Sequence, residues 1–292
     1  MKKVIIILVL ILVVIFAALF FLKKRDNFSE YVQAENLPEV TELYFLDVGQ
    51  GDATFIEFKN GTQALVDCGK SAKVLEELGR VMDFRDKSID YLIITHPDND
   101  HYGGCIDVLE RFDVANVVYN GQHKNNDEFW NEFWRRVKKE GSNYHVVKSE
   151  EKWFVGDDVL HFLFPDGSLI QNLSDNNNSI VFILESAGKK VLFTGDMEQE
   201  LEIYLIEKFG EKLGVDILKV GHHGSGSSSI DKFVDMVLPY YSIIPVGKNK
   251  YGHPSLRVMR RLERSGSRIF RTDLLHGVKI LLDEELSMDQ IK

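Results

Sequence analysis

The order of strand-like and helical runs is the feature that most limits how this 292-residue chain can fold. Three short β-rich runs lie between residues 42 and 67, separated by glycine-containing turns, and apolar strands mixed with helices follow them. A second series of this kind begins near residue 159. Since every sheet must bury its apolar surface, the repetition predicts an α+β fold, a four-layer αββα sandwich with helices outside two facing sheets. Loops from both halves would then meet at one edge.

A cluster of potential metal ligands follows the apolar run at residues 91–95. It consists of His96, Asp98, Asp100 and His101. Carboxylates and imidazoles together suit zinc, manganese or iron. Because alternate residues of an extended loop point the same way, we expect the first three to converge on one ion and His101 to face a second. The alternative is a surface turn rich in Asp and Asn.

Other residues capable of chemistry follow later strands. Asp196 comes directly after a glycine, His222 and His223 stand between two glycines, and His253 precedes Pro254. We expect one histidine of the pair to bind metal and the other to face substrate. Proline suits the first turn of a helix, so His253 is a candidate to bind an anionic group or protonate a leaving group. The alternatives are a turn aspartate, a loop-capping histidine pair and an exposed histidine at a helix start.

Three motifs together resemble those of a known family. Thr-His-Pro-Asp-Asn-Asp-His-Tyr-Gly-Gly at residues 95–104 resembles the signature loop of the metallo-β-lactamase superfamily, usually His-x-His-x-Asp-His. Here Asp98 replaces the second histidine. With Phe-Leu-Asp-Val-Gly-Gln-Gly-Asp at residues 45–52 and His-His-Gly-Ser at 222–225, the chain resembles the hydrolase domain of ComEC-type DNA-uptake proteins. The resemblance implies the metallo-β-lactamase fold for residues 41–292.

The resemblance also implies roles for single residues. Asp196 would bridge two ions. Asp67 would support the signature loop at residues 95–104, here called the metal loop, without binding metal. The second histidine of the pair would be a ligand. The loop that supplies a further histidine in the wider family reads Asp-Asn-Asn-Asn-Ser at residues 175–179, so Asn178 would take an outer or weak ligand role. One or two divalent ions, Zn or Mn, are expected, and the oxygen-richer first site favours manganese. The expected metal ligands are His96, Asp98, Asp100, His101, Asp196 and His223.

The N-terminal region differs from the rest in composition. Residues 4–22 are uninterruptedly apolar between pairs of lysines, and about 20 such residues suffice to cross a bilayer as a helix. We expect an uncleaved signal-anchor at residues 1–25, a polar stalk at 26–40 and a location in the cell membrane. Short positive N-termini usually stay in the cytoplasm, so the catalytic domain would face outward. A cleaved signal and a secreted protein are the alternative.

The chain has two cysteines, Cys68 and Cys105. An even number in an exported protein permits one disulfide. Each cysteine follows one of the motifs above, and we expect two separate buried thiols instead.

Charge bears on the substrate. The formal net charge of -10 opposes non-specific attraction to nucleic acid or to an anionic membrane surface. Arginine pairs well with phosphate, so a local basic strip would suit a phosphate-bearing polymer, although a solvated helix face fits equally well. The members of this strip are Lys248, Lys250, Arg257, Arg260, Arg261, Arg264, Arg268 and Arg271.

These expectations combine into a membrane-anchored, metal-dependent hydrolase, with a phosphodiesterase or nuclease that uses a metal-activated water favoured. Asp100 would orient that water, while His222 and His253 would face the substrate. A helix at residues 128–138 would cover the site. The alternatives are an ester, lactone or β-lactam hydrolase, and a non-catalytic module that binds DNA or the cell envelope. The expected partners are the membrane and nucleic acid or another phosphodiester; no protein partner is inferred.

Overall fold

The structure is a computed structural model that describes residues 37–124, 126–167 and 174–291. Val40–Lys292 forms one compact unit, which contains both sheets. The predicted signal-anchor, residues 1–25, and most of the predicted stalk lie outside the described residues. Within the described ranges, no helix has the length and apolar character needed to cross a membrane.

Two sheets form the centre of this unit, and the described residues contribute eight strands to one and seven to the other. The first sheet runs in the order β15 (Met288–Gln290), β14 (Val278–Leu281), β1 (Glu42–Phe45), β2 (Thr54–Glu57), β3 (Gln63–Val66), β4 (Ser88–Ile94), β5 (Asp113–Tyr119) and β6 (Asn143–Val146). The second runs in the order β13 (Arg268–Arg271), β12 (Tyr241–Ile244), β11 (Ile217–Lys219), β10 (Lys189–Phe193), β9 (Val181–Ser186), β8 (Asp158–Phe164) and β7 (Glu151–Val155).

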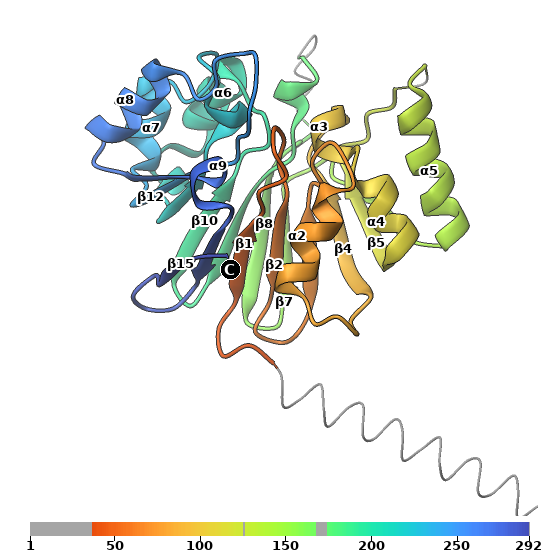
Figure 1. Ribbon diagram of the computed structural model, residues 1–292. Helices are drawn as coiled ribbons and strands as arrows, with labels where there is room; N and C mark the ends of the chain where they lie inside the picture. Colours follow the sequence, from red (N-terminus) through yellow and green to blue (C-terminus); the bar gives the residue numbers. More distant parts are fainter. Residues whose placement is uncertain (1–36, 125, 168–173, 292) are drawn as a thin grey trace, which may run out of the picture. The chain divides into compact units, whose positions relative to one another are not determined.

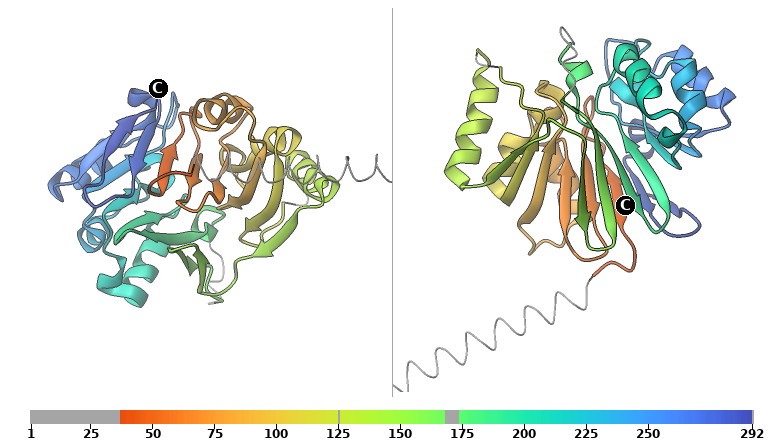
Figure 2. Two further views of the ribbon diagram at one scale, coloured as in Figure 1. Left: turned by 90° about the horizontal axis from the view of Figure 1, so that it is seen from below. Right: turned by 180° about the vertical axis from the view of Figure 1, so that it is seen from behind.

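Helices form the two outer layers. The first sheet is covered by α2 (Lys73–Val81), α4 (Cys105–Arg111) and α5 (Glu128–Glu140), and the second by α6 (Gln199–Phe209), α7 (Asp231–Val237) and α8 (Leu256–Arg264). The shorter elements are α3 (Asn99–Tyr102), α9 (Thr272–Leu275) and the 3₁₀ turns η1 (Asn176–Asn178), η2 (Gly210–Leu213) and η3 (Gly221–Gly224). Figure 1 shows the two groups of helices on opposite sides, and Figure 2 shows the two sheets between them.

Apolar side chains alternate along the strands and fill both sides of each sheet. On β9, Phe182 and Leu184 belong to the cluster between the sheets, whereas Val181 and Ile183 belong to the cluster beneath α6, α7 and α8. This is the two-residue period of a strand that is buried on both faces. The layer order is helix, sheet, sheet, helix, which confirms the predicted αββα sandwich.

The carboxyl ends of parallel strands position the candidate site. Strand β3 runs parallel to β4, and β10, β11 and β12 run parallel to one another. The loops that follow these strands carry Asp67, His96, Asp196, His223 and His253. Because parallel strands end at a common edge, the two facing sheets bring these loops together near α3 (Figure 1).

Helix α5 does not cover the site, so that expectation was wrong. Its apolar face packs against α4 and β5, and Trp130 and Phe133 are buried in the outer cluster. The Tyr102 ring centroid lies 4.8 Å from the Trp130 ring. The apolar positions that suggested a lid are therefore used to extend the outer helical layer.

Candidate metal centre

Four side chains from both halves of the chain converge at this edge. His101 Nε2 lies 3.2 Å from Asp196 Oδ1. His223 Nε2 lies 3.4 Å from Asp196 Oδ2 and 3.4 Å from Asp100 Oδ2. His101, Asp196 and His223 are buried, whereas the Asp100 side chain is 33% exposed. Three of these ligand groups are thus enclosed by protein, and the fourth opens to solvent.

The unpaired atoms of this group fit a divalent cation. His101 Nε2, His223 Nε2 and Asp196 Oδ1 are buried without a hydrogen-bond partner among the described residues, as is His96 Nε2. Each such atom costs about 1–3 kcal/mol unless something satisfies it. Burial lowers the pKa of His223, but Asp196 and Asp52 raise it to about 10, so the surroundings favour positive charge. Two imidazoles with two carboxylates suit zinc, manganese or iron.

The metal loop is helical where an extended loop was expected. Asp98 is the N-cap of α3, and helical backbone begins at the next residue. This turn sends Asp100 toward His223 and places the His101 ring beside His96, with ring centroids 4.2 Å apart. The expectation that His96, Asp98 and Asp100 would converge through alternation was therefore wrong.

Asp98 does not join the converging group in this structure. Its Oδ1 is paired with the Lys124 ammonium, and its Oδ2 lies 3.6 Å from His96 Nε2. Lys124 also lies 3.2 Å from Asp175 Oδ2. The carboxylate that replaces a histidine in the signature loop is thus bound by a lysine as well as facing His96. His96 joins His101 and Asp196 in a possible metal-ligand group.

Asp67 supports His101 from the side opposite Asp196. Its Oδ2 lies 2.7 Å from His101 Nδ1 and accepts a hydrogen bond from Thr95 Oγ1 at 2.7 Å. Its Oδ1 accepts from Thr95 N at 2.8 Å. Carboxylates placed in this way fix the orientation and tautomer of a metal-binding histidine.

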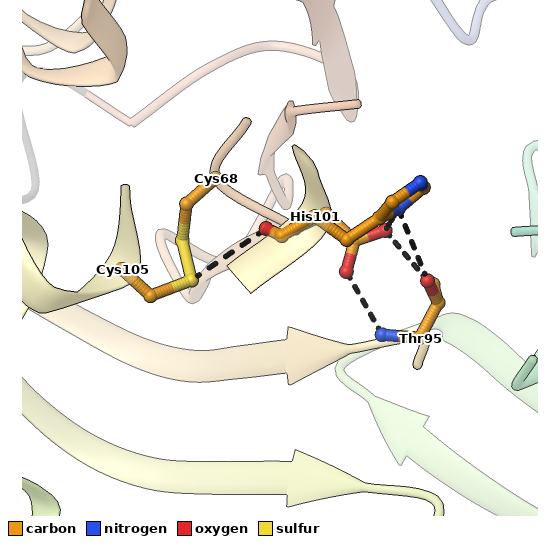
Figure 3. The surroundings of a disulfide bond; sticks show 5 residues. Cys68, Thr95, His101 and Cys105 are labelled. Atoms are coloured by element: carbon orange, nitrogen blue, oxygen red, sulfur yellow. Dashed lines mark hydrogen bonds and ion pairs between the residues drawn. A yellow bond between two sulfur atoms is a disulfide. The ribbon is translucent and has the colours of Figure 1, made fainter. Parts of the chain in front are cut away.

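The two cysteines form a disulfide, so the expectation of separate thiols was wrong. Cys68 follows Asp67, and Cys105 begins α4 four residues after His101; their Cα atoms are 5.2 Å apart. Cys68 N donates to His101 O at 2.7 Å, which brings the two segments together. Figure 3 shows the bridge beside the His101 carbonyl, with the His101 ring facing Thr95. The disulfide therefore links the segment of Asp67, which orients His101, to the segment that follows His101 in the chain.

The histidine pair divides between the centre and its margin. His222 and His223 both adopt left-handed backbone, with φ of 48° and 52°. His223 is buried among the converging groups, and its Nδ1 lies 3.0 Å from Pro245 O. The His222 side chain is 23% exposed, and its Nδ1 lies 3.3 Å from Glu198 Oε1.

His253 lies next to this pair. Its ring centroid is 5.4 Å from that of His222 and 6.5 Å from that of His223. Burial and the neighbouring His222 lower the pKa of His253, which favours its neutral form. Pro254 precedes α8 and does not stand in its first turn as expected, because Ser255 is the N-cap and accepts from Val258 N at 3.3 Å.

Asn178 forms a hydrogen bond within its own loop. Its side-chain amide donates to Ser174 O at 3.0 Å. The next residue approaches instead: Ser179 Oγ lies 3.3 Å from His96 Nδ1 and accepts from Asp196 N at 3.0 Å. The loop that lacks a histidine therefore contributes a serine hydroxyl beside the centre.

Two residues beneath the centre were missed by the sequence reasoning. Asp52 and Lys219 are buried and paired with each other, and Asp52 Oδ1 lies 3.1 Å from His223 Nδ1. Burial raises the pKa of Asp52, but Lys219 and His223 lower it below its ordinary value. The available signals were an aspartate at the end of a double-glycine turn and a lysine that ends an apolar strand.

A groove of about 630 Å³ adjoins the centre at Asp100. Its other charged lining residues are Lys70, Lys248 and Lys250, and Tyr251 also lines it. The predicted basic strip is divided: Lys248 and Lys250 lie here, whereas arginines of α8 line a separate pocket. Among them, Arg261 and Arg264 pair with Asp231.

The groove loop is organised around Asn249. The Asn249 amide donates to Gly247 O and to His253 O, both at 2.8 Å. Its Oδ1 accepts from Tyr251 N at 3.0 Å and from His253 N at 3.1 Å. One asparagine thus fixes the loop that holds His253 near the centre and presents two lysines to the groove.

The fold and these side chains define a class: an αββα sandwich with histidines and aspartates from both halves gathered at one edge. Residues 46–248 match the Metallo-beta-lactamase superfamily, and the chain belongs to that family. The similar proteins include three bacterial relatives, which confirms the resemblance to ComEC-type competence proteins.

ComE operon protein 3 of Bacillus subtilis (strain 168) is 31% identical over 254 residues, covering 80% of this chain and 32% of that protein. Recombination protein 2 of Haemophilus influenzae is 30% identical over 254 residues, covering 85% of this chain and 30% of that protein. Competence protein ComA of Neisseria gonorrhoeae is 30% identical over 231 residues, covering 78% of this chain and 30% of that protein. The chain therefore spans about a third of the length of these relatives.

Among solved structures, CmlA, a diiron beta-hydroxylase from Streptomyces venezuelae, matches with a TM-score of 0.54 and 17% identity. The match covers 84% of this chain and 55% of that one. At this identity the likeness shows the fold alone.

Proposed function

We propose that this protein is a metal-dependent phosphodiesterase that acts on a polyanion such as single-stranded DNA. The observation that carries the proposal is the groove beside the centre. Asp100 belongs to both, and the other charged residues that line the groove are Lys70, Lys248 and Lys250. Ammonium groups attract phosphates, so these lysines would favour a polyanion locally although the chain as a whole has a formal net charge of -10. Similarity to proteins named for competence and recombination supports a nucleic-acid substrate.

The buried ligands and the exposed carboxylate have different tasks. A bound divalent ion, Zn or Mn, would polarise a phosphoryl oxygen and make a water more acidic. His101, Asp196 and His223 would hold it, because both imidazole Nε2 atoms are buried without a hydrogen-bond partner and lie 3.2 Å and 3.4 Å from oxygens of the Asp196 carboxylate. Asp100 would orient the attacking water, since its side chain faces both the centre and the groove.

His222 and His253 would contact the substrate. Their rings are neighbours at the margin of the centre, and the His222 side chain is partly exposed. Because its pKa is lowered, His253 would act first by accepting a hydrogen bond. His96 and Asp98 would form a second, weaker position for an ion, since Lys124 competes for Asp98.

Hydrolysis tests this proposal. The purified protein is incubated with bis(p-nitrophenyl) phosphate or single-stranded DNA in the presence of Mn²⁺ or Zn²⁺. We expect release of product that is lost in Asp100→Asn and in His101→Ala. Asp47→Asn is the matched control, because Asp47 pairs with Lys73. Unchanged activity in both test variants would remove the assignment.

The same preparation separates the rival activities. A β-lactam, a lactone and a simple ester are assayed beside the diester, and DNA binding is measured without turnover. We expect the diester to be hydrolysed faster than the carbonyl substrates, because the lysines that line the groove attract a phosphate and give no advantage to a neutral lactone or ester. Binding of DNA without hydrolysis of any substrate would favour a non-catalytic module.

We also propose that residues 4–22 anchor the protein in the cell membrane with residues 41–292 outside the cytoplasm. The disulfide supports this orientation, since such bonds persist mainly in oxidising compartments. Protease treatment of intact cells would digest the domain if it faces outward. Protection of the domain in intact cells, with digestion after lysis, would contradict the orientation.

A further inference from the structure

We propose that Asp52 and Lys219 are positioning residues for the centre: Asp52 orients His223, and Lys219 holds Asp52 together with the loop of Asp196. The inference goes beyond the proposed reaction and rests only on its metal-binding part. It concerns a buried pair that lies beneath the ligands and does not face the groove.

The two nitrogens of His223 face different surroundings. Nε2 lies 3.4 Å from Asp100 Oδ2 and 3.4 Å from Asp196 Oδ2, on the side of the expected ion. Nδ1 lies 3.1 Å from Asp52 Oδ1 and 3.0 Å from Pro245 O. Two acceptors at Nδ1 keep the proton there and leave the lone pair of Nε2 for a metal. The Asp52 carboxylate therefore lies beside Nδ1 of His223, just as the Asp67 carboxylate lies beside Nδ1 of His101.

The backbone fixes Asp52 in this place. Asp52 N donates to Asp100 O at 3.2 Å, and Asp52 O accepts from Gly69 N at 2.7 Å. The preceding Gly51 has φ of +137°, and a Cβ there would lie 2.3 Å from Asp100 O. Asp52 thus contacts the metal loop through its main-chain N–H. Its side chain contacts Lys219 and His223, which belong to the second half of the protein.

Lys219 completes the connection between the halves. Its ammonium pairs with Asp52 Oδ2, donates to Gly195 O at 2.6 Å and lies 3.9 Å from Asp196 Oδ1. The residue is only 3% exposed. Buried ion pairs often stabilise a fold no better than apolar residues do, so the pair calls for a role other than stability. Its position indicates a positioning role. Asp52 contacts the ligand His223, whereas Lys219 contacts the loop that carries Asp196.

The test measures the affinity of the full-length protein for Co²⁺ by calorimetry and the absorption spectrum of the bound ion. We expect Asp52→Asn to weaken Co²⁺ binding about 10- to 100-fold and to shift the visible bands, because the ring of His223 loses the negatively charged carboxylate at Nδ1 and keeps only neutral acceptors there. Asp47→Asn, in the same loop, should leave both unchanged.

A double variant separates positioning from folding. Lys219→Met alone leaves the buried Asp52 carboxylate charged and without its ammonium partner, so we expect a lower midpoint of denaturant unfolding. Asp52→Asn/Lys219→Met removes both charges and should recover most of that midpoint, while Co²⁺ binding stays at least about tenfold weaker than in the wild type. Wild-type affinity and spectrum in Asp52→Asn or in the double variant would overturn the inference. A wild-type protein that binds Co²⁺ without cleaving any diester removes only the proposed function.

Discussion

At the scale of single residues, Asp100 and His101 show how adjacent ligands reach different partners. They lie in the four-residue helix α3, so Asp100 meets His223 while His101 meets Asp196. The sequence identified both residues as ligand candidates, but it predicted the wrong geometry for their loop. A helix of one turn has no periodicity that distinguishes it from an extended loop.

A substitution at Gly51 tests how tightly the turn before Asp52 is packed against the metal loop. Gly51→Ala would place a Cβ 2.3 Å from Asp100 O at a φ that favours glycine. We expect a loss of roughly 2–4 kcal/mol in the free energy of unfolding, together with weaker metal binding. Gly79→Ala is the control, because this α2 residue has open space and should gain about 0.5–1 kcal/mol. Equal effects in denaturant titrations would contradict the packing argument.

Glu202 makes stability depend on pH. Burial raises its pKa from 4.5 to about 7, although Ser229 N and Ile230 N donate to the carboxylate. Between these values the folded state binds more protons than the unfolded state, so the contribution of Glu202 to the free energy of unfolding falls as pH rises. Across this window we expect the wild type to lose roughly 1–3 kcal/mol relative to Glu202→Gln.

Denaturant unfolding at several pH values measures this difference. Glu207→Gln, an exposed position on the same helix, is the matched control. A Glu202→Gln variant with the wild-type slope of stability against pH would show that Glu202 does not titrate in this window.

At the scale of elements, the disulfide fastens the end of β3 to the start of α4. Cys68→Ser/Cys105→Ser should lower the free energy of unfolding by about 2–4 kcal/mol. It should also weaken metal binding, because Asp67 and His101 are no longer tied to each other through the bridge. Calorimetry with Mn²⁺ on the variant, and on the wild type with and without a reductant, checks this. Unchanged affinity in the variant would separate the bridge from the centre.

The loop between β12 and α8 should determine how a polyanion binds. Lys248→Glu/Lys250→Glu should raise KM for single-stranded DNA about tenfold at low salt and much less at high salt. Turnover of the small aryl diester should change little. Arg257→Glu/Arg260→Glu reverses the same number of charges in the α8 pocket and should have a smaller effect. Equal effects of the two pairs would place the substrate path elsewhere.

The elements found from sequence were those with a strong apolar pattern. The β-rich runs between residues 42 and 67 correspond to β1, β2 and β3, the apolar run at residues 91–95 lies at the end of β4, and the helix expected at residues 128–138 is α5. Strands β5, β6, β7, β13 and β15 were not identified. Strand β6 has the burial of an edge strand, and β13 carries arginines at both ends, so neither shows the apolar run or clean alternation of a core strand.

At the scale of the whole molecule, both halves contribute to one centre. The first half supplies Asp52, Asp100 and His101, and the second supplies Asp196 and His223. The motifs indicated that loops from both halves would meet, because each motif follows a strand. The disulfide and the pairing of Asp52 with Lys219 could not be predicted in this way, since both depend on distances between segments far apart in the chain.

The central claim is that these converging side chains bind a metal ion. Elemental analysis of the purified protein, after exposure to Mn²⁺ or Zn²⁺ and removal of free ion, tests it most directly. We predict at least one equivalent of bound ion per chain, and its loss in His101→Ala/His223→Ala with the circular dichroism spectrum retained. Less than one equivalent in the wild type, or the same metal content in the double variant, would contradict the account.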